Sequence, residues 1–100
     1  MEYKIILSSA AIKELQESYQ WYEGRSEGLG VRFVELIDKA IKLILLNPEG
    51  YPNKRGSYRE IVLNKFPYLI VYEFVKKKHL VYILHVFQTK RSPSLKYKRK

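Results

Sequence analysis

The spacing of apolar residues changes once along this chain of 100 residues, at Asn47-Pro48, and the change limits the folds open to it. Before that point, apolar residues recur every three or four positions over two long stretches, which predicts amphipathic helices. After it come short segments rich in β-branched and aromatic residues, which predict strands. Because a residue before proline disfavours the helical conformation, the second helix should end at Asn47-Pro48.

The two predicted helices should form a hairpin. The first begins after an N-cap at Ser9 and ends near residue 24, and the second runs from about Leu29 to Leu46. Their apolar stripes consist of Ile12, Leu15, Tyr19 and Tyr22 in the first helix, and of Phe33, Leu36, Ile37, Ala40 and Ile44 in the second. Gly28 and Gly30 lie in the few residues between them, and so short a link is typical of a helical hairpin.

Predicted strands flank this hairpin on both sides. Residues 3–7 precede it, while Tyr58–Leu63, Tyr68–Val75 and Leu80–Phe87 follow it, with links short enough for β-hairpins. Glu49–Ser57 is rich in turn-forming residues and is predicted to be a loop. The order βααβββ predicts an α+β fold, with the helical hairpin packed on one face of a small, mainly antiparallel sheet. The last two strands are apolar on both sides, so we expect their second face to lie in a groove or under a partner.

Positive charge gathers in the second half of the chain. Residues 1–50 hold eight acidic and six basic residues, whereas residues 51–100 hold two acidic and thirteen basic residues. We expect one domain over residues 1–90, followed by a basic tail over residues 91–100. The asymmetry favours a polyanion, an acidic protein surface or an anionic membrane as a partner, and it says little about the fold.

Composition excludes several classes of protein. Without cysteine the chain cannot form disulfides or thiolate metal sites, and two histidines leave little for a histidine site, so we expect no metal and no cofactor. An apolar fraction of 46% is too high for a disordered chain. No apolar run is long enough for a signal peptide or a membrane span, which favours a cytoplasmic protein with no membrane partner.

No catalytic motif of high specificity is present, and the candidate functional residues are mostly cations. Lys54, Arg55, Arg59 and Arg91 are candidates for binding a phosphate or a target, because guanidinium pairs with phosphate through two hydrogen bonds and lysine adds a point charge. If the chain cleaves RNA, the candidate catalytic residues are Arg59, Arg91, Lys54 and Tyr97. Basic residues in loops and tails are also common as plain solvated charges.

Two further residues have alternative interpretations. His85 lies in an apolar strand, which favours a hydrogen-bonded histidine of the core or a groove over a catalytic one. Trp21 falls off the main apolar stripe of the first helix, which fits either a contact surface or the edge of helix packing equally well.

Several short motifs follow one another in an order that resembles a known family. They are Leu7-Ser8-Ser9-Ala10-Ala11, Trp21-Tyr22, Gly30-Val31-Arg32-Phe33, Asn47-Pro48, Tyr51-Pro52, Tyr58-Arg59, Phe66-Pro67-Tyr68-Leu69-Ile70-Val71-Tyr72 and Arg91-Ser92-Pro93. With this order and spacing, nearly the whole chain resembles the RelE/ParE superfamily of type II toxin–antitoxin toxins. The resemblance implies the same helical hairpin on a small sheet.

The resemblance implies a toxin, and the mode of action divides within the superfamily. RelE-like members are ribosome-dependent endoribonucleases that cut mRNA, whereas ParE-like members inhibit DNA gyrase. Arg59 and Arg91 match arginines common in the superfamily, but Gln88 stands where many relatives have a histidine. Glutamine cannot shuttle a proton, so the chain looks closer to the ParE side and enzyme activity is left open.

The partners follow from the same resemblance. A cognate antitoxin is expected to neutralise the toxin, and the expected target is DNA gyrase or, for the RelE-like alternative, the ribosome with mRNA. A role in plasmid stabilisation fits this class of protein. A third alternative is a degenerate toxin that only binds a partner, and the oligomeric state is left open.

Overall fold

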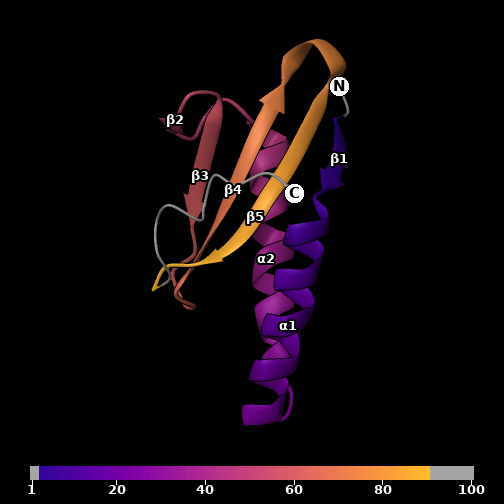
Figure 1. The fold of residues 1–100 in the computed structure, drawn as a ribbon, viewed down its shortest axis with the longest axis vertical. Helices are drawn as coiled ribbons and strands as arrows, with labels where there is room; N and C mark the ends of the chain where they lie inside the picture. Colours follow the sequence, from indigo (N-terminus) through magenta and orange to yellow (C-terminus); the bar gives the residue numbers. More distant parts are fainter. Residues whose placement is uncertain (1–2, 91–100) are drawn as a thin grey trace.

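A computed structural model describes residues 3–90 of the chain. It confirms the predicted α+β fold, in which two helices cover one face of a single sheet (Figure 1). The elements are β1 (Lys4–Leu7), α1 (Ser9–Arg25), α2 (Leu29–Leu46), β2 (Asn53–Arg55), β3 (Tyr58–Val62), β4 (Tyr68–Val75), the short 3-10 helix η1 (Lys76–Lys78) and β5 (Leu80–Gln88). The predicted basic tail lies outside the described residues, and so do two candidate site residues, Arg91 and Tyr97.

The sheet has five strands in the order β1-β5-β4-β3-β2. Strands β3, β4 and β5 form the predicted antiparallel meander, and β1 pairs with β5 in parallel. The prediction of a loop over residues 49–57 is wrong in part, because Asn53–Arg55 pair with β3 across a turn at Gly56, whose φ is +58°. All three residues of β2 are polar and exposed, so no apolar alternation marks this strand in the sequence.

The side chain of Glu23 closes the helical hairpin. Its carboxylate oxygens accept hydrogen bonds from the backbone N–H groups of Gly28 (2.8 Å) and Gly30 (2.9 Å). These groups lie at the start of α2, where the positive end of the helix dipole also favours a carboxylate. Gly30 has to be small, because a Cβ atom there would lie 2.6 Å from the carbonyl oxygen of Tyr19. The predicted tight connection is therefore confirmed.

Helix α1 begins at Ser9, and its N-cap is Ser8 rather than the predicted Ser9. The Ser8 hydroxyl accepts a hydrogen bond from the N–H of Ala11 (2.9 Å) and donates one to the carbonyl oxygen of Leu84 in β5 (2.6 Å). The prediction is wrong because the second bond joins residues 76 positions apart, which no local pattern reveals. Ser8 thus caps the helix and fastens its first turn to the sheet.

Both faces of the sheet are apolar at the centre. On the helix side, Tyr68, Ile70 and Tyr72 of β4 join a core that includes Phe33 and Ile37 of α2. On the opposite side, a second buried cluster consists of Leu69, Val71, Leu84 and Phe87. The side chains of β4 divide between the faces as strict alternation predicts. The second cluster is buried within this chain alone, so no partner is needed to account for its apolar composition.

Replacing Ser8 by alanine should lower the free energy of unfolding by about 1–3 kcal/mol, because it removes the helix cap and leaves the Leu84 carbonyl without its donor. Ser9→Ala is the matched control: Ser9 is exposed, so its replacement should change that free energy by less than about 0.5 kcal/mol. Urea titration followed by circular dichroism measures both values. Equal destabilisation by the two substitutions would contradict the assignment of the cap to Ser8.

Candidate functional site

The predicted cations that the structure describes lie toward one edge of the sheet, on β2 and β3. Lys54 and Arg55 are exposed on β2, and Arg59 is half-buried on β3, where it pairs in register with Asn53. The strand pairing therefore brings together three of the four residues predicted to bind a phosphate or a target. The fourth, Arg91, lies outside the described residues.

Arg59 holds the loop that connects α2 to β2. Its Nη1 donates hydrogen bonds to the carbonyl oxygens of Tyr51 (2.6 Å) and Glu49 (3.1 Å). Hydrogen bonds from a charged donor are stronger than those between neutral groups, so these contacts contribute to the stability of the loop. Arg59 therefore has a structural role, whatever its contact with a target, and Lys54 and Arg55 are the exposed cations of this edge.

Tyr72 holds the start of the same loop. Its side chain is fully buried, and its hydroxyl donates a hydrogen bond to the carbonyl oxygen of Pro48 at 2.7 Å. Burial raises the pKa of the Tyr72 phenol to about 12, an effect that Arg59 partly opposes and Tyr51 reinforces. The phenol is therefore protonated at neutral pH and serves as a hydrogen-bond donor to the loop.

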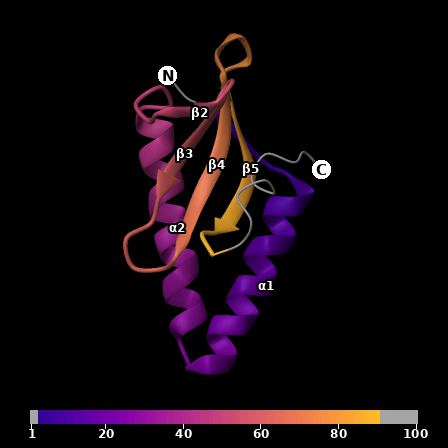
Figure 2. The same cartoon turned by 60° about the vertical axis from the view of Figure 1, so that its left-hand side comes forward.

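A second polar region lies where α1 runs alongside the end of β5 (Figure 2). An additional residue in β5, Leu84, interrupts the pairing of β5 with β4: Val71 pairs with His85, whereas Tyr72 pairs with Ile83. Such a β-bulge bends the strand and changes the direction of the side chains that follow it. The bulge therefore decides which groups of β5 face α1.

Glu14 of α1 binds β5 immediately after the bulge. Its Oε2 lies 2.9 Å from His85 Nδ1, and its Oε1 accepts a hydrogen bond from the backbone N–H of Val86 at 3.0 Å. His85 is 5% exposed, so the interpretation of this residue as a buried, hydrogen-bonded histidine is confirmed. One carboxylate thus satisfies both a ring nitrogen and a backbone donor at the end of the sheet.

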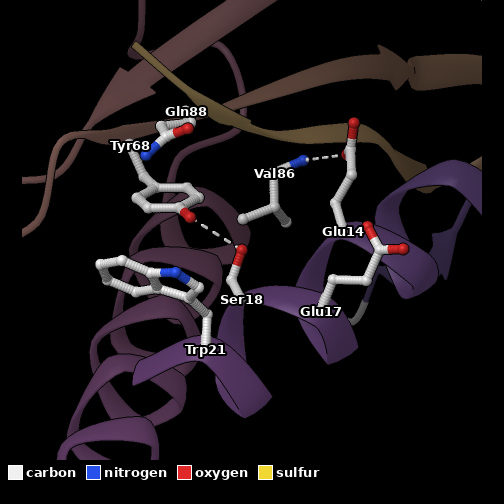
Figure 3. A pocket seen from close by; sticks show the side chains of 7 residues that line it. All are labelled: Glu14, Glu17, Ser18, Trp21, Tyr68, Val86 and Gln88. Carbon is white, nitrogen blue, oxygen red and sulfur yellow. Dashed lines mark hydrogen bonds between the residues drawn. The ribbon is translucent and has the colours of Figure 1, made fainter. Parts of the chain in front are cut away.

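Glu14 also forms part of a cavity that we call the α1–β5 pocket (Figure 3). Its volume is about 220 Å³, and it is lined by Glu14, Glu17, Ser18, Trp21, Tyr68, Val86 and Gln88. The hydroxyl groups of Ser18 and Tyr68 share a hydrogen bond of 2.8 Å. Figure 3 shows the side chains of Glu14 and Glu17 on one side of the cavity, and the rings of Trp21 and Tyr68 on the other. The pocket therefore combines anionic and aromatic groups.

The sequence alone points to Trp21 and Gln88 separately, but it does not show that both residues line one pocket. Glu14 and Val86 are 72 positions apart, and the bulge that precedes Val86 is not encoded in the alternation of apolar residues. The signal available in the sequence is Trp21, which lies off the main stripe of α1 and is 56% exposed. Of the two interpretations of Trp21, its exposure fits a contact surface.

Residues 3–90 contain neither a cluster of metal-binding side chains nor a helix that could span a membrane. Within these residues, no three histidine, aspartate or glutamate side chains gather so that they could hold a metal ion. Neither helix in the same part of the chain combines the length and the apolar composition that crossing a membrane requires.

Comparison with solved structures identifies the fold. A chain of the chromosomal ParDE toxin–antitoxin system from P. aeruginosa matches with a TM-score of 0.72 and 19% identity, over 89% of this chain and 98% of that chain. A chain of the intact E. coli RelBE toxin–antitoxin complex matches with a TM-score of 0.64 and 23% identity, over 89% and 99%. A mutant of the E. coli toxin RelE in complex with an antitoxin RelBc peptide gives a TM-score of 0.64 and 25% identity, over 100% and 99%.

The fold is thus that of RelE and ParE toxins, and a family model narrows the class. The model for the "ParE toxin of type II toxin-antitoxin system, parDE" matches residues 5–93. Because the match spans most of the sequence, the chain belongs to the ParE toxin family, and the predicted membership of the RelE/ParE superfamily is confirmed. No curated protein sequence matches the chain.

Arg59→Ala should lower the free energy of unfolding by about 1–2 kcal/mol, because the carbonyl groups of Glu49 and Tyr51 lose their charged donor. Lys54→Ala is the control at an exposed cation of the same edge, and it should change that free energy by less than about 0.5 kcal/mol. Urea titration of the purified variants measures the difference. An Arg59→Ala variant as stable as the wild type would refute the structural role of this residue.

The raised pKa of Tyr72 predicts a loss of stability at high pH. The phenol ionises near pH 10 in the unfolded chain, whereas its pKa in the folded protein is about 12. Its contribution is therefore fully present below about pH 10 and is lost as the pH rises to about 12. Tyr72→Phe lacks this titration, so the difference in unfolding free energy between wild type and variant should shrink across that range. Urea titrations at several alkaline pH values measure it, and a constant difference would contradict the prediction.

Proposed function

We propose that this chain is a ParE-like toxin that acts by binding: it inhibits DNA gyrase, and a cognate antitoxin neutralises it. The observation that carries the proposal is the match to the ParE toxin family over residues 5–93. The similar chain from P. aeruginosa belongs to a ParDE system, which supports the same assignment. The E. coli chain of the same fold forms a complex with an antitoxin, which supports a protein partner of that kind here.

The chemistry at the end of β5 favours a binding protein over a nuclease. Gln88, which stands where many relatives have a histidine, lines a pocket that also contains Glu14 and Glu17. Carboxylates repel the phosphodiester backbone of RNA, so this pocket is a poor site for it. His85 of the same strand is buried and bound to Glu14. An imidazole that could move a proton at an RNA hydroxyl is therefore lacking at this end of the described strand.

A ribosome-dependent mRNA endoribonuclease of the RelE type is the second candidate. The observation in its favour is that Lys54 and Arg55 are adjacent and exposed on β2, where basic side chains could bind phosphate groups. In this alternative, Arg59 and Arg91 would stabilise the charge of the phosphate, and Lys54 or Tyr97 would handle protons.

Expression without an antitoxin separates the two candidates. A gyrase inhibitor should arrest growth and relax a reporter plasmid, and the purified protein should inhibit supercoiling by gyrase while leaving mRNA intact in a reconstituted translation reaction. Coexpression of a protein encoded by a neighbouring short reading frame should restore growth. Gel electrophoresis with an intercalating dye measures the supercoiling, and primer extension maps any cut in the mRNA.

The variant Lys54→Ala/Arg55→Ala serves as the internal comparison, because both side chains are exposed. One outcome would refute the gyrase proposal in favour of the nuclease. In it, the wild type cleaves mRNA on the ribosome and leaves supercoiling unchanged, and the variant no longer cleaves mRNA. A wild-type chain that neither slows growth nor affects either target would instead be a degenerate toxin that only binds a partner.

A further inference from the structure

The α1–β5 pocket is not accounted for by the proposed inhibition of gyrase. It presents carboxylate groups on a chain whose formal net charge is +9. A concave anionic site on a strongly cationic protein is a place where an incoming cation binds without the repulsion that it meets elsewhere. The groups that line this pocket therefore indicate the chemistry of its occupant.

Glu17 is the carboxylate that remains available in the pocket. Both oxygens of Glu14 already have partners, Val86 N–H and His85 Nδ1, so Glu14 adds negative charge without offering a further directed contact. Glu17 is exposed and makes no hydrogen bond or ion pair within residues 3–90. A ligand that enters the pocket can therefore pair with Glu17 without displacing an existing contact.

Trp21 supplies an aromatic surface that already binds a cation. The guanidinium carbon of Arg25 lies 4.4 Å from the centre of the Trp21 ring, within the range of a cation–π interaction. Arg25 is not among the residues that line the pocket, and Trp21 is 56% exposed. Figure 3 shows Trp21 and Tyr68 facing the cavity from the side opposite Glu17. A cation in the cavity would thus lie between a carboxylate and aromatic rings.

The size of the pocket limits the occupant to one side chain. Its volume of about 220 Å³ is smaller than the roughly 300–1,000 Å³ typical of sites for whole small molecules. Among cationic side chains, arginine fits best, because its planar guanidinium stacks on aromatic rings and pairs with a carboxylate through two hydrogen bonds. Lysine, a compact and strongly hydrated charge, uses neither feature.

We propose that the α1–β5 pocket receives one arginine side chain of the antitoxin. This inference rests on the proposed function, from which the antitoxin follows as the partner. The guanidinium pairs with Glu17 and lies against Trp21, while the amide of Gln88 offers a further polar contact at the rim. Because the basic half of the toxin favours acidic residues elsewhere on a partner, a single arginine in an anionic pocket sets the register of the bound segment.

The proposal is tested first without the antitoxin, using N-acetyl-L-arginine amide as the probe and N-acetyl-L-citrulline amide as its neutral isostere. The chain has one tryptophan, so its indole N–H gives a single reporter signal in a ¹H–¹⁵N spectrum. The arginine derivative should shift this signal in a saturable manner and the citrulline derivative should not. Glu17→Gln should abolish the shift, whereas Glu27→Gln, an exposed acid between the helices, should preserve it. Equal shifts with both probes, or a shift that survives Glu17→Gln, would overturn the proposal.

The second test uses the antitoxin encoded beside the toxin gene. Its dissociation constant should rise at least about tenfold with Glu17→Gln and stay unchanged with Glu27→Gln, as measured by titration calorimetry. Equal affinities would overturn the proposal, and so would a Glu17→Gln variant that binds the antitoxin normally but no longer inhibits gyrase. If the wild-type chain binds the arginine probe but does not arrest growth, the proposed function is refuted and the assignment of the pocket to arginine stands. If the wild-type chain arrests growth but does not bind the arginine probe, the assignment of the pocket to arginine is refuted and the proposed function stands.

Discussion

The rest of the structure depends on the way α1 replaces a strand at one edge of the sheet. Strand β1 pairs with only the first part of β5, and beyond Ile83 the groups on that edge need other partners. Helix α1 and its N-cap supply them: Ser8 donates its N–H and its hydroxyl proton to the carbonyl oxygens of Ile83 and Leu84, and Glu14 of α1 accepts from the N–H of Val86. These contacts fix the position of the helical hairpin on the sheet and, with it, the space between α1 and β5.

At the other edge of the sheet, side chains again bind backbone carbonyl groups. Strand β2 is only three residues long, and the loop before it is held by side chains rather than by further pairing. Arg59 binds the carbonyl groups of Glu49 and Tyr51, and Tyr72 binds that of Pro48. Arg59, which the family resemblance marks as a candidate functional residue, therefore also contributes to the stability of the fold. Loss of activity on replacing Arg59 is informative only when the stability of the variant is known.

The local sequence pattern predicts an element well where burial determines its composition. The bounds of α2 and β4 agree with the sequence prediction. Helix α2 has an apolar stripe that includes the buried Phe33 and Ile37, and β4 is a nearly continuous run of apolar and aromatic residues. The cap at Ser8, the strand β2 and the bulge at Leu84 could not be predicted, since each depends on a partner distant in the sequence or on polar residues without periodicity. The pocket lies beside that bulge, so the sequence pattern does not reveal the pocket either.

The division between gyrase inhibitors and nucleases cannot be read from the fold, because RelE and ParE toxins share it. It has to be argued from the binding sites, and residues 3–90 contain two candidate sites of opposite charge: exposed cations on β2, and Glu17 beside the end of β5. Strands β3 and β4 lie between β2 and β5. A nucleic acid would bind the first site and be repelled by the second. A protein segment of mixed charge can satisfy both, so the charge pattern of this chain is complementary to a polypeptide more than to RNA. The excess of positive charge, which at first favours a polyanion, is therefore equally consistent with a toxin whose principal contacts are with proteins.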